Sequence, residues 1–457
     1  MENDLLTRCH DAWLALEPFR RERLRCKRLS YGTDGASANN LVRQLLKSVV
    51  GRYRYLRVGS TVDLDADVRA ELDLDARTLE EFLISGMAVN RRRLDPHHGR
   101  HEFANVSPER IFFTRCSEPD ASDATLVGML HDFSATQLLR QFGDDDPALC
   151  RDLMEHYRGR QAAYPAAPCV EAPMSWDTST LPGHVRVIEA WEAVCVHTLY
   201  CHDLLQAELF TVPYTAEAQA AVDAVNARRR ADRSPEVLTL LDNDDAWLHT
   251  WLSPAGRVLR RETVSRDAFP FALRLYPMTD GETHSLVADV APQQLHINRL
   301  VALLDRVIDQ SAKGVLLFPT EQLPDGFTWQ DMRRIWANPG GIIPYKRTSR
   351  SLSPQQVNST GWNQGAGEML KLQLDLFAEV SGLAPSFRGR EAAFAGSEAA
   401  KVDSQNASIA LMDIMGAFHA FVAQRNQMTG KEGVAKSGES WRMHRGASLR
   451  SDRNSEF

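Results

Sequence analysis

The stretch VADVAPQQLHINRLVALLDRVIDQSAKGVLLFP, residues 287–319, combines a long amphipathic helix with a short apolar strand. Between Gln293 and Lys313 the apolar residues recur at helical spacing, and they are Ile297, Leu300, Val301, Leu304, Val307 and Ile308. At the rise of an α-helix, this segment is roughly 30 Å long. We expect Pro292 and its polar neighbours to begin the helix. Such a pattern is more typical of an assembly than of a catalytic motif.

The N-terminal part has local signals for three helices. Residues 1–30 are expected to be helical, and a second helix begins near Leu41 and ends at Gly51. A third helix should stop at Gly86 and pass into a strand that begins with MAV, residues 87–89. Each break is a glycine, which readily adopts the left-handed conformation that ends a helix.

Similar signals continue towards the C-terminus. Ser134 is placed to cap a helix, and the residues PAG at 254–256 are placed to turn a β-hairpin. A helix is predicted over residues 369–382, and a second long helix over residues 397–428. The apolar residues of this long helix are Met412, Met415, Phe418, Phe421 and Val422, a pattern typical of a core or a subunit interface.

These elements predict an α+β fold with long helices and small mixed β regions. We expect an N-terminal α+β region, a linker, a β-rich region, a long-helix region and a disordered tail, over residues 1–160, 161–184, 185–292, 293–428 and 429–457. The long-helix region contains a Gly-, Pro- and Ser-rich loop at residues 336–368. Loops of this length are usually functional or disordered.

Composition excludes several classes of protein. The chain has 457 residues, 43% of them hydrophobic and 25% charged, and a net charge of −7. A broad surface that binds nucleic acid tightly would make the chain more basic. There is no signal-peptide pattern and no apolar window long enough for a membrane span. Seven scattered cysteines indicate reduced thiols and assembly in a cytosol.

Two clusters of metal-ligand residue types occur in the chain. His97, His98 and His101 form the first, and Cys195, His197 and Cys201 share one face of a predicted strand. Neither cluster has a partner cluster at the spacing of a zinc motif. Acidic runs at residues 143–148 and 242–247 are interpreted as solvated loops. A metal-dependent hydrolase or nuclease that uses these clusters remains the alternative function.

The long loop also contains PYKRTSRS, which places Lys346, Arg347 and Arg350 close together. Three positive charges on a loop can contact a phosphate backbone. A solvated surface loop is an equally good interpretation of the same residues.

The order of segments resembles that of bacteriophage portal proteins from short-tailed phages and their gut-phage relatives. The similar segments cover residues 30–428 loosely, and they include NNLVRQLLKSVVGRYR, FLISGMAVNR, NVSPERIFFT, DATLVGMLHDFS, VRVIEAWEAV, LYPMTDGETHSLVADVAPQQLHIN and SGLAPSFRGREAAFAGSEAAKVDSQNASIALMDIMGAF. The family's Asp-Pro-Gln motif is replaced here by Ala291-Pro292-Gln293. Relatives continue into a crown after the last helix, and we expect the crown to be absent here.

The resemblance implies a portal-like fold with wing and stem helices, assembled as a ring of twelve subunits. Such a ring lies at one capsid vertex of the virion, after assembly in the host cytoplasm, and passes double-stranded DNA during packaging and ejection. Its partners would be the terminase, capsid and scaffolding proteins and a tail adaptor, with no membrane, cofactor, metal or catalytic residue. A head–tail adaptor is a further structural alternative, but adaptors are usually much shorter, so the length of 457 residues counts against it.

The resemblance also assigns roles to candidate residues. Lys346, Arg347 and Arg350 are expected near the DNA channel. The two long helices are expected to supply the contacts between subunits, through Gln293, Asn298, Leu304, Met412, Met415 and Phe418.

Overall fold

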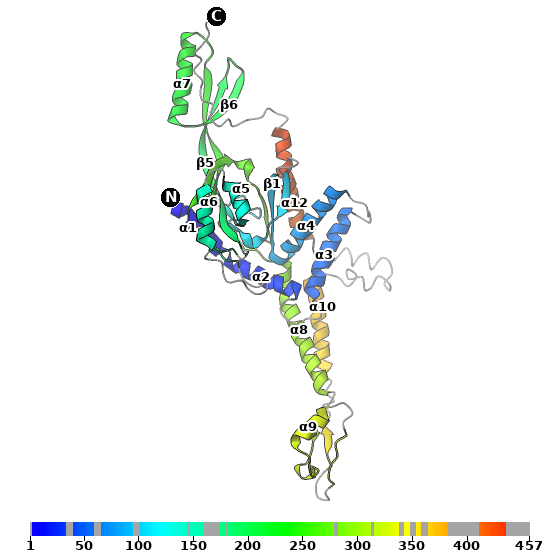
Figure 1. The fold of residues 1–457 in the computed structure, drawn as a ribbon. Coiled ribbons are helices and arrows are strands. Elements are labelled where there is room, and N and C mark those ends of the chain that lie inside the picture. Colours follow the sequence, from blue (N-terminus) through cyan, green and yellow to red (C-terminus); the bar gives the residue numbers. More distant parts are fainter. Residues whose placement is uncertain are drawn as a thin grey trace, which may run out of the picture. The chain divides into compact units, whose positions relative to one another are not determined.

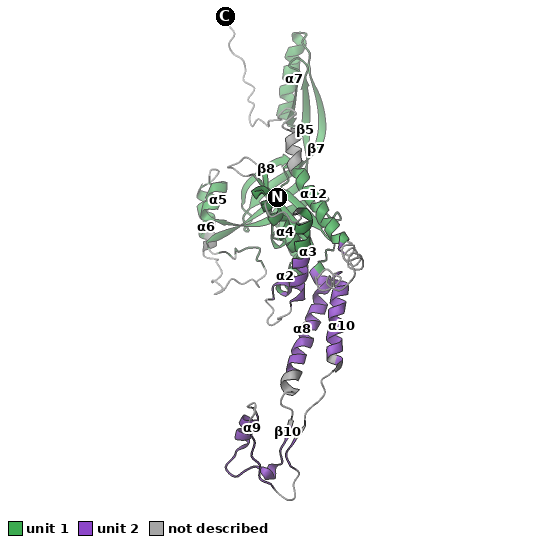
Figure 2. Cartoon of the chain, turned by 90° about the vertical axis from the view of Figure 1, so that its right-hand side faces the viewer, with its two compact units in different colours: residues 1–28, 49–286, 412–457 green, residues 29–48, 287–411 purple. Residues whose placement is uncertain are grey.

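The computed structural model of the chain divides into two compact units (Figures 1 and 2). Unit 1 comprises residues 1–28, 49–286 and 412–457, and unit 2 comprises residues 29–48 and 287–411. The structure describes residues 2–32, 40–58, 65–94, 101–143, 147–158, 174–179, 181, 183–277, 282–311, 315–337, 342–347, 353–357, 364–382 and 411–435.

The described residues form an α+β fold. Its α-helices are α1 (Glu2–Ala15), α2 (Glu17–Tyr31), α3 (Leu41–Val58), α4 (Ala66–Ser85), α5 (Ala135–Phe142), α6 (Pro147–Arg158), α7 (Ala216–Ala231), α8 (Leu286–Ser311), α9 (Trp329–Ala337), α10 (Gln364–Val380) and α12 (Met412–Ala435). Its strands are β1 (Met87–Leu94), β2 (His101–Asn105), β3 (Ile111–Phe113), β4 (Leu126–Ser134), β5 (His184–Asp203), β6 (Glu208–Pro213), β7 (Val237–Leu252), β8 (Val258–Ser265), β9 (Phe271–Leu275), β10 (Val315–Leu317) and β11 (Gln355–Val357). No helix in this part of the chain is long and apolar enough to cross a bilayer.

The larger sheet of unit 1 is antiparallel and has the order β3-β4-β5-β7-β8. One face carries Ile188 and Leu252, which pack with Trp13 of α1. Trp191 and Trp247 belong to a separate buried cluster. β5 is 20 residues long and β7 is 16, so the β regions are larger than the small regions predicted from the sequence. The sheet is also antiparallel, whereas mixed β regions were predicted.

The outer ends of β5 and β7 extend beyond the other strands of this sheet and join β6 and α7 (Figure 1). We call this substructure the distal lobe, and it consists of residues 197–203, β6, α7 and residues 237–243. On one face of its sheet Leu199, Cys201 and Val237 are buried, with Val222 and Val225 of α7 packed against them. The lobe therefore has two layers, one of strands and one of helix.

The smaller sheet of unit 1 has the order β2-β1-β9 and follows directly from α4. Gly86 ends α4 with a φ of 76°, and its amide donates to the Phe82 carbonyl oxygen at 2.7 Å. A Cβ at Gly86 would lie 2.8 Å from the His284 carbonyl oxygen and 2.9 Å from that of Tyr276. Both the conformation and the close approach therefore require glycine.

Unit 2 contains α8 and α10, which run side by side in both views (Figures 1 and 2). Ile297 of α8 and Phe377 of α10 are buried. The Gln294 side chain is buried, accepts a hydrogen bond from the Leu41 amide at 2.9 Å and donates to Asn298 Oδ1 at 2.7 Å. This polar contact connects α8 to the start of α3 within unit 2.

Several predictions of local structure are confirmed. The helix that stops at Gly86 and the strand that follows it are present. Ser134 caps α5 in a reciprocal arrangement with Gln137. The β-hairpin turns between β7 and β8, where Gly256 has a φ of 89°, and Gly382 follows α10 with a φ of 66°.

The predicted start of the long helix is wrong. α8 begins at Leu286, and Pro292 lies inside it. An interior proline costs ~3 kcal/mol because it removes a backbone hydrogen bond and clashes with the preceding turn. Val287, Val290 and Ala291 are buried, and the burial of this first turn and a half offsets that cost.

Other helix ends also differ from the predictions. α3 runs through Gly51 to Val58, because Tyr53 beyond the glycine is buried and hydrogen-bonded. The first 30 residues form two helices that meet at Leu16. α10 begins at Gln364, and β11 lies inside the segment predicted to be a loop.

The last described helix only partly overlaps the prediction of a helix over residues 397–428. α12 covers Met412–Ala435 and therefore extends into the segment predicted to be a disordered tail. Residues 397–410 lie outside the described part of the chain, as do residues 436–457.

Candidate functional site

One side of α8 exposes apolar and basic side chains together. Leu295 is 38% exposed and Leu303 is 48% exposed. Arg299 and Arg306 are exposed on the same side, at helical spacings of four and eleven residues from Leu295. Among the described residues, neither arginine has an ion-pair partner. We call these four residues the α8 surface.

α10 carries the opposite charge on its exposed side. Glu368, Leu372, Asp375 and Glu379 are exposed at spacings of four, seven and eleven residues, with Leu372 52% exposed. We call these four residues the α10 surface. Each of the two surfaces therefore combines exposed leucine with charged side chains of one sign. The α8 and α10 surfaces are complementary to each other in charge.

Of the sequence-predicted interface residues on α8, only part of each side chain is accessible. Gln293, Asn298 and Leu304 are all half-buried. Asn298 accepts from Gln294, whereas the buried Gln293 Oε1 has no hydrogen-bond partner in the described part of the chain.

The three candidates on α12 have different surroundings. Met412 is 68% exposed and Met415 is half-buried. Phe418 is fully buried and contacts the rings of Tyr53 and Phe82. Phe418 therefore packs the core of its own unit, and Met412 is the most accessible of the three.

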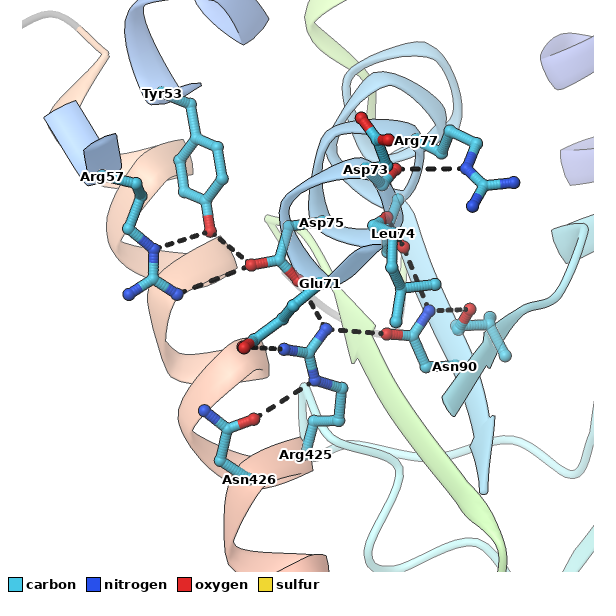
Figure 3. Close-up of polar contacts among 12 residues, drawn as sticks. Tyr53, Arg57, Glu71, Asp73, Leu74, Asp75, Arg77, Asn90, Arg425 and Asn426 are labelled. Carbon is cyan, nitrogen blue, oxygen red and sulfur yellow. Dashed lines mark hydrogen bonds and ion pairs between the residues drawn. The ribbon is translucent and has the colours of Figure 1, made fainter. Parts of the chain in front are cut away.

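A buried charge cluster surrounds Arg425 of α12 (Figure 3). Arg425 is 2% exposed and donates to both carboxylates that face it, Asp75 through Nη1 and Glu71 through Nη2 at 3.2 Å. The Tyr53 hydroxyl donates to Asp75 Oδ2 at 2.8 Å, and Arg57 lies 3.5 Å from the same oxygen.

This cluster connects α12 to α3 and α4. Burial and the hydrogen bond to Asp75 raise the pKa of Tyr53 to about 12, so its hydroxyl stays protonated and remains a donor. The carboxylate of Asp75 is 1% exposed and is compensated by Arg425. We interpret the cluster as a structural connection, because a buried charge requires such partners.

A second buried cluster surrounds Glu189 of β5, which is fully buried. Glu189 accepts hydrogen bonds from Arg91 at 2.7 Å, His131 at 2.6 Å, Trp191 at 3.1 Å and His249 at 3.2 Å. Because Arg91 belongs to β1 and the others to the larger sheet, this carboxylate connects the two sheets of unit 1.

Protonation in this cluster follows from its contacts. Burial raises the pKa of Glu189, but Arg91 and the histidine hydrogen bonds outweigh it and hold the pKa well below its ordinary value. Burial lowers the pKa of His131, which favours a neutral ring that donates from Nε2. The two ring nitrogens of His249 face carboxylate oxygens of Glu189 and Glu262.

The residues predicted to contact DNA are only partly described. Lys346 and Arg347 are exposed, and Lys346 Nζ lies 3.1 Å from Asp325. The Lys346 amide donates to the Gln322 carbonyl oxygen at 3.0 Å, which ties this segment to the residues before α9. Arg350 lies outside the described residues.

The candidate metal-ligating histidines and cysteines are only partly described. Cys195 is exposed on β5, whereas Cys201 is buried beneath α7. His197 contacts Asn243 on the neighbouring strand. His97 and His98 lie outside the described residues. Where the chain is described, no three metal-ligating side chains are grouped for an ion.

Sequence reasoning missed Arg425, Asp75 and Glu189. A signal was present for the first two, since each lies on the apolar side of its helix. Arg425 follows Phe418 by seven residues, and Asp75 lies between the buried Leu72 and Leu79. A charged residue in an apolar stripe indicates a buried ion pair. Glu189 has no comparable local signal.

Comparison with known proteins identifies the family that this pattern belongs to. A protein-family sequence model described as phage P22-like portal protein matches residues 75–420. This match includes β1, the larger sheet, α8 and α10. A search of curated proteins found no match.

Proposed function

Because the chain belongs to the phage P22-like portal protein family, we propose that it forms a closed ring that serves as the DNA conduit at one capsid vertex. Portal proteins are head–tail connectors and a structural family, not an enzyme family. In this role the chain binds copies of itself, and double-stranded DNA passes through the ring during packaging and ejection.

The ring proposal rests on the opposite charges of the α8 and α10 surfaces. A ring repeats one heterologous contact, in which different surfaces of adjacent subunits meet. The basic α8 surface of one subunit fits the acidic α10 surface of the next, with leucines on both sides. Pairing these charges compensates arginines that have no ion-pair partner among the described residues.

The other interface candidates are proposed as further contacts between subunits. Gln293, Asn298 and Leu304 lie on α8, and Met412 and Met415 provide accessible apolar surface on α12. Gln293 is half-buried, so part of its side chain is accessible to a neighbouring subunit.

We further propose that Lys346, Arg347 and Arg350 face the channel. In a chain with a net charge of −7, a few loop cations would attract phosphates without holding DNA tightly. Alanine at all three positions should reduce the yield of packaged DNA, and unchanged packaging would contradict this assignment.

The remaining partners follow from the proposed position in the virion. A ring of twelve subunits at the vertex would bind the terminase during packaging and a tail adaptor afterwards, and would contact capsid and scaffolding proteins. We assign the chain no catalytic residue and no cofactor.

A charge-reversal experiment tests the ring. Arg299→Glu with Arg306→Glu should prevent assembly, because two acidic helix surfaces would then face each other. Adding Glu368→Lys, Asp375→Lys and Glu379→Lys to the same chain should restore it. Arg140→Glu on α5 is the matched control for loss of an exposed arginine. If the reversed α8 variant assembles as well as the wild-type chain, the proposed contact is wrong.

A further inference from the structure

The sheet of the distal lobe has one face that no described residue covers, and this face exposes several apolar side chains beside polar ones. Leu209, Leu238 and Leu240 are 57%, 56% and 63% exposed, and Tyr200 is 38% exposed. The strand register places them on one face, because Tyr200 is opposite Leu240, and His202 is opposite both Leu209 and Leu238. α7 covers the other face (Figures 1 and 2).

When one face of a sheet is exposed to water, the residues on that face are normally polar. Here apolar side chains occur on both faces of β5, β6 and β7, which is the pattern of a sheet covered on both sides. One face has its own helix, and the open face requires a second covering layer.

The outer side of α7 has the surface that such a layer requires. Ala216, Ala220, Ala224, Ala227 and Ala231 are exposed in one row, at spacings of four, four, three and four residues. An exposed helix side would ordinarily carry long polar residues. A row of small side chains lets another backbone approach closely, so leucines from a facing sheet can pack against it.

We propose that the open sheet face of one distal lobe packs against the alanine row of α7 from the next copy of this chain. The inference rests on the proposed ring. The two surfaces lie on opposite sides of the same lobe, so the contact is heterologous and repeats around a closed ring. Each sheet is then covered by a helix on both faces, one its own and one from the neighbour.

The size of the open face favours a neighbour that is already held in place. β6 pairs with six residues of β5, so the face is ~20 Å long and, across three strands, ~15 Å wide. Its area of ~300 Å² is well below the ~800 Å² per partner of a stable independent complex. The partner must therefore be held by another contact as well. A second copy bound through the α8 and α10 surfaces is held in this way, so the lobe contact adds to a larger interface.

Thiol accessibility tests the contact without assuming a register between the lobes. In a chain with Cys169→Ser and Cys195→Ser, single cysteines are introduced as Leu240→Cys on the open face, Ala224→Cys on the alanine row and Gln206→Cys in the turn after β5. The rate of maleimide modification is measured on free chains and on rings separated by size.

We expect positions 240 and 224 to react at least tenfold more slowly in rings than in free chains, while position 206 reacts at the same rate in both. Rings in which position 240 or position 224 reacts as fast as in the free chain would overturn the lobe contact and leave the ring intact. Failure of the unsubstituted chain to assemble under any condition would instead reject the proposed function, and the lobe contact with it.

Discussion

The buried ion pair between Arg425 and Asp75 should contribute strongly to the stability of the chain. Arg425→Met leaves Asp75 buried without its main counter-charge, which should lower the free energy of unfolding by ~3–5 kcal/mol. Chemical denaturation of the free chain measures this loss. Arg57→Met is the matched control, because Arg57 is 45% exposed and its pairing contributes at most ~1 kcal/mol.

A double variant separates the charge from the packing. Arg425→Met with Asp75→Leu removes both buried charges and should recover much of the lost stability, since apolar pairs replace buried ion pairs at little cost. A double variant that is less stable than Arg425→Met alone would mean that Arg425 and Asp75 act independently.

The Glu189 cluster predicts how stability depends on pH. The folded-state pKa of Glu189 is lowered, so its contribution is present above the ordinary pKa of a glutamate and is lost as pH falls. The folded-state pKa of His131 is also lowered, so below the ordinary pKa of histidine the unfolded chain binds more protons. The His131 effect therefore reduces the free energy of unfolding below about pH 6.5, and the Glu189 effect adds to it below about pH 4.3.

Denaturant titrations at several pH values test this account, with Glu189→Gln as the variant. At pH 7 the variant should lose ~3–5 kcal/mol, because Arg91 keeps a partly buried charge without its partner. Its stability should then change less than that of the wild-type chain as pH falls. Glu262→Gln, on a more exposed carboxylate, is the control and should follow the wild-type profile.

Two glycines give an opposite pair of predictions at the scale of the element. Gly86→Ala should lower the free energy of unfolding by more than ~1 kcal/mol, because a Cβ meets two carbonyl oxygens and the left-handed φ disfavours alanine. Gly51→Ala should raise it by ~0.5–1 kcal/mol, because Gly51 lies inside α3 and a Cβ there meets nothing. Changes of the same sign would contradict the helix boundaries.

The same two glycines show how much of the fold could be predicted from the sequence. Gly86 was recognised because a strand pattern follows it, and the local signal agrees with the tertiary structure. Gly51 was misread because the contacts of Tyr53 with Phe418 and Asp75 continue the helix. The helix start predicted at Pro292 is wrong for the same reason, because the local pattern does not reveal that Val287 and Val290 are buried.

At the candidate site, the sequence predicted the family and the presence of the long helices, but few of the individual side-chain contacts. The family is confirmed, whereas the interface and channel residues stay predictions. Phe418 was identified as an apolar position, but its burial against Tyr53 required the structure. The Glu189 cluster joins residues from four strands, and a single sequence cannot reveal such a convergence.

In the whole molecule, ring formation requires that separate surfaces contribute to assembly together. The α8 and α10 surfaces are charged, so assembly through them should weaken as salt rises, because screening reduces their attraction. The lobe contact is apolar and should not weaken. If the assembled fraction at 1 M salt equals that at 0.1 M, the charges of α8 and α10 do not drive assembly.

The mass of the purified chain in solution shows whether it forms a ring. One chain has a mass of 51.2 kDa. We expect a closed species of about twelve chain masses by light scattering, with a central hole in images of the same sample. A species that remains at the mass of a single chain over the whole accessible concentration range would contradict the ring.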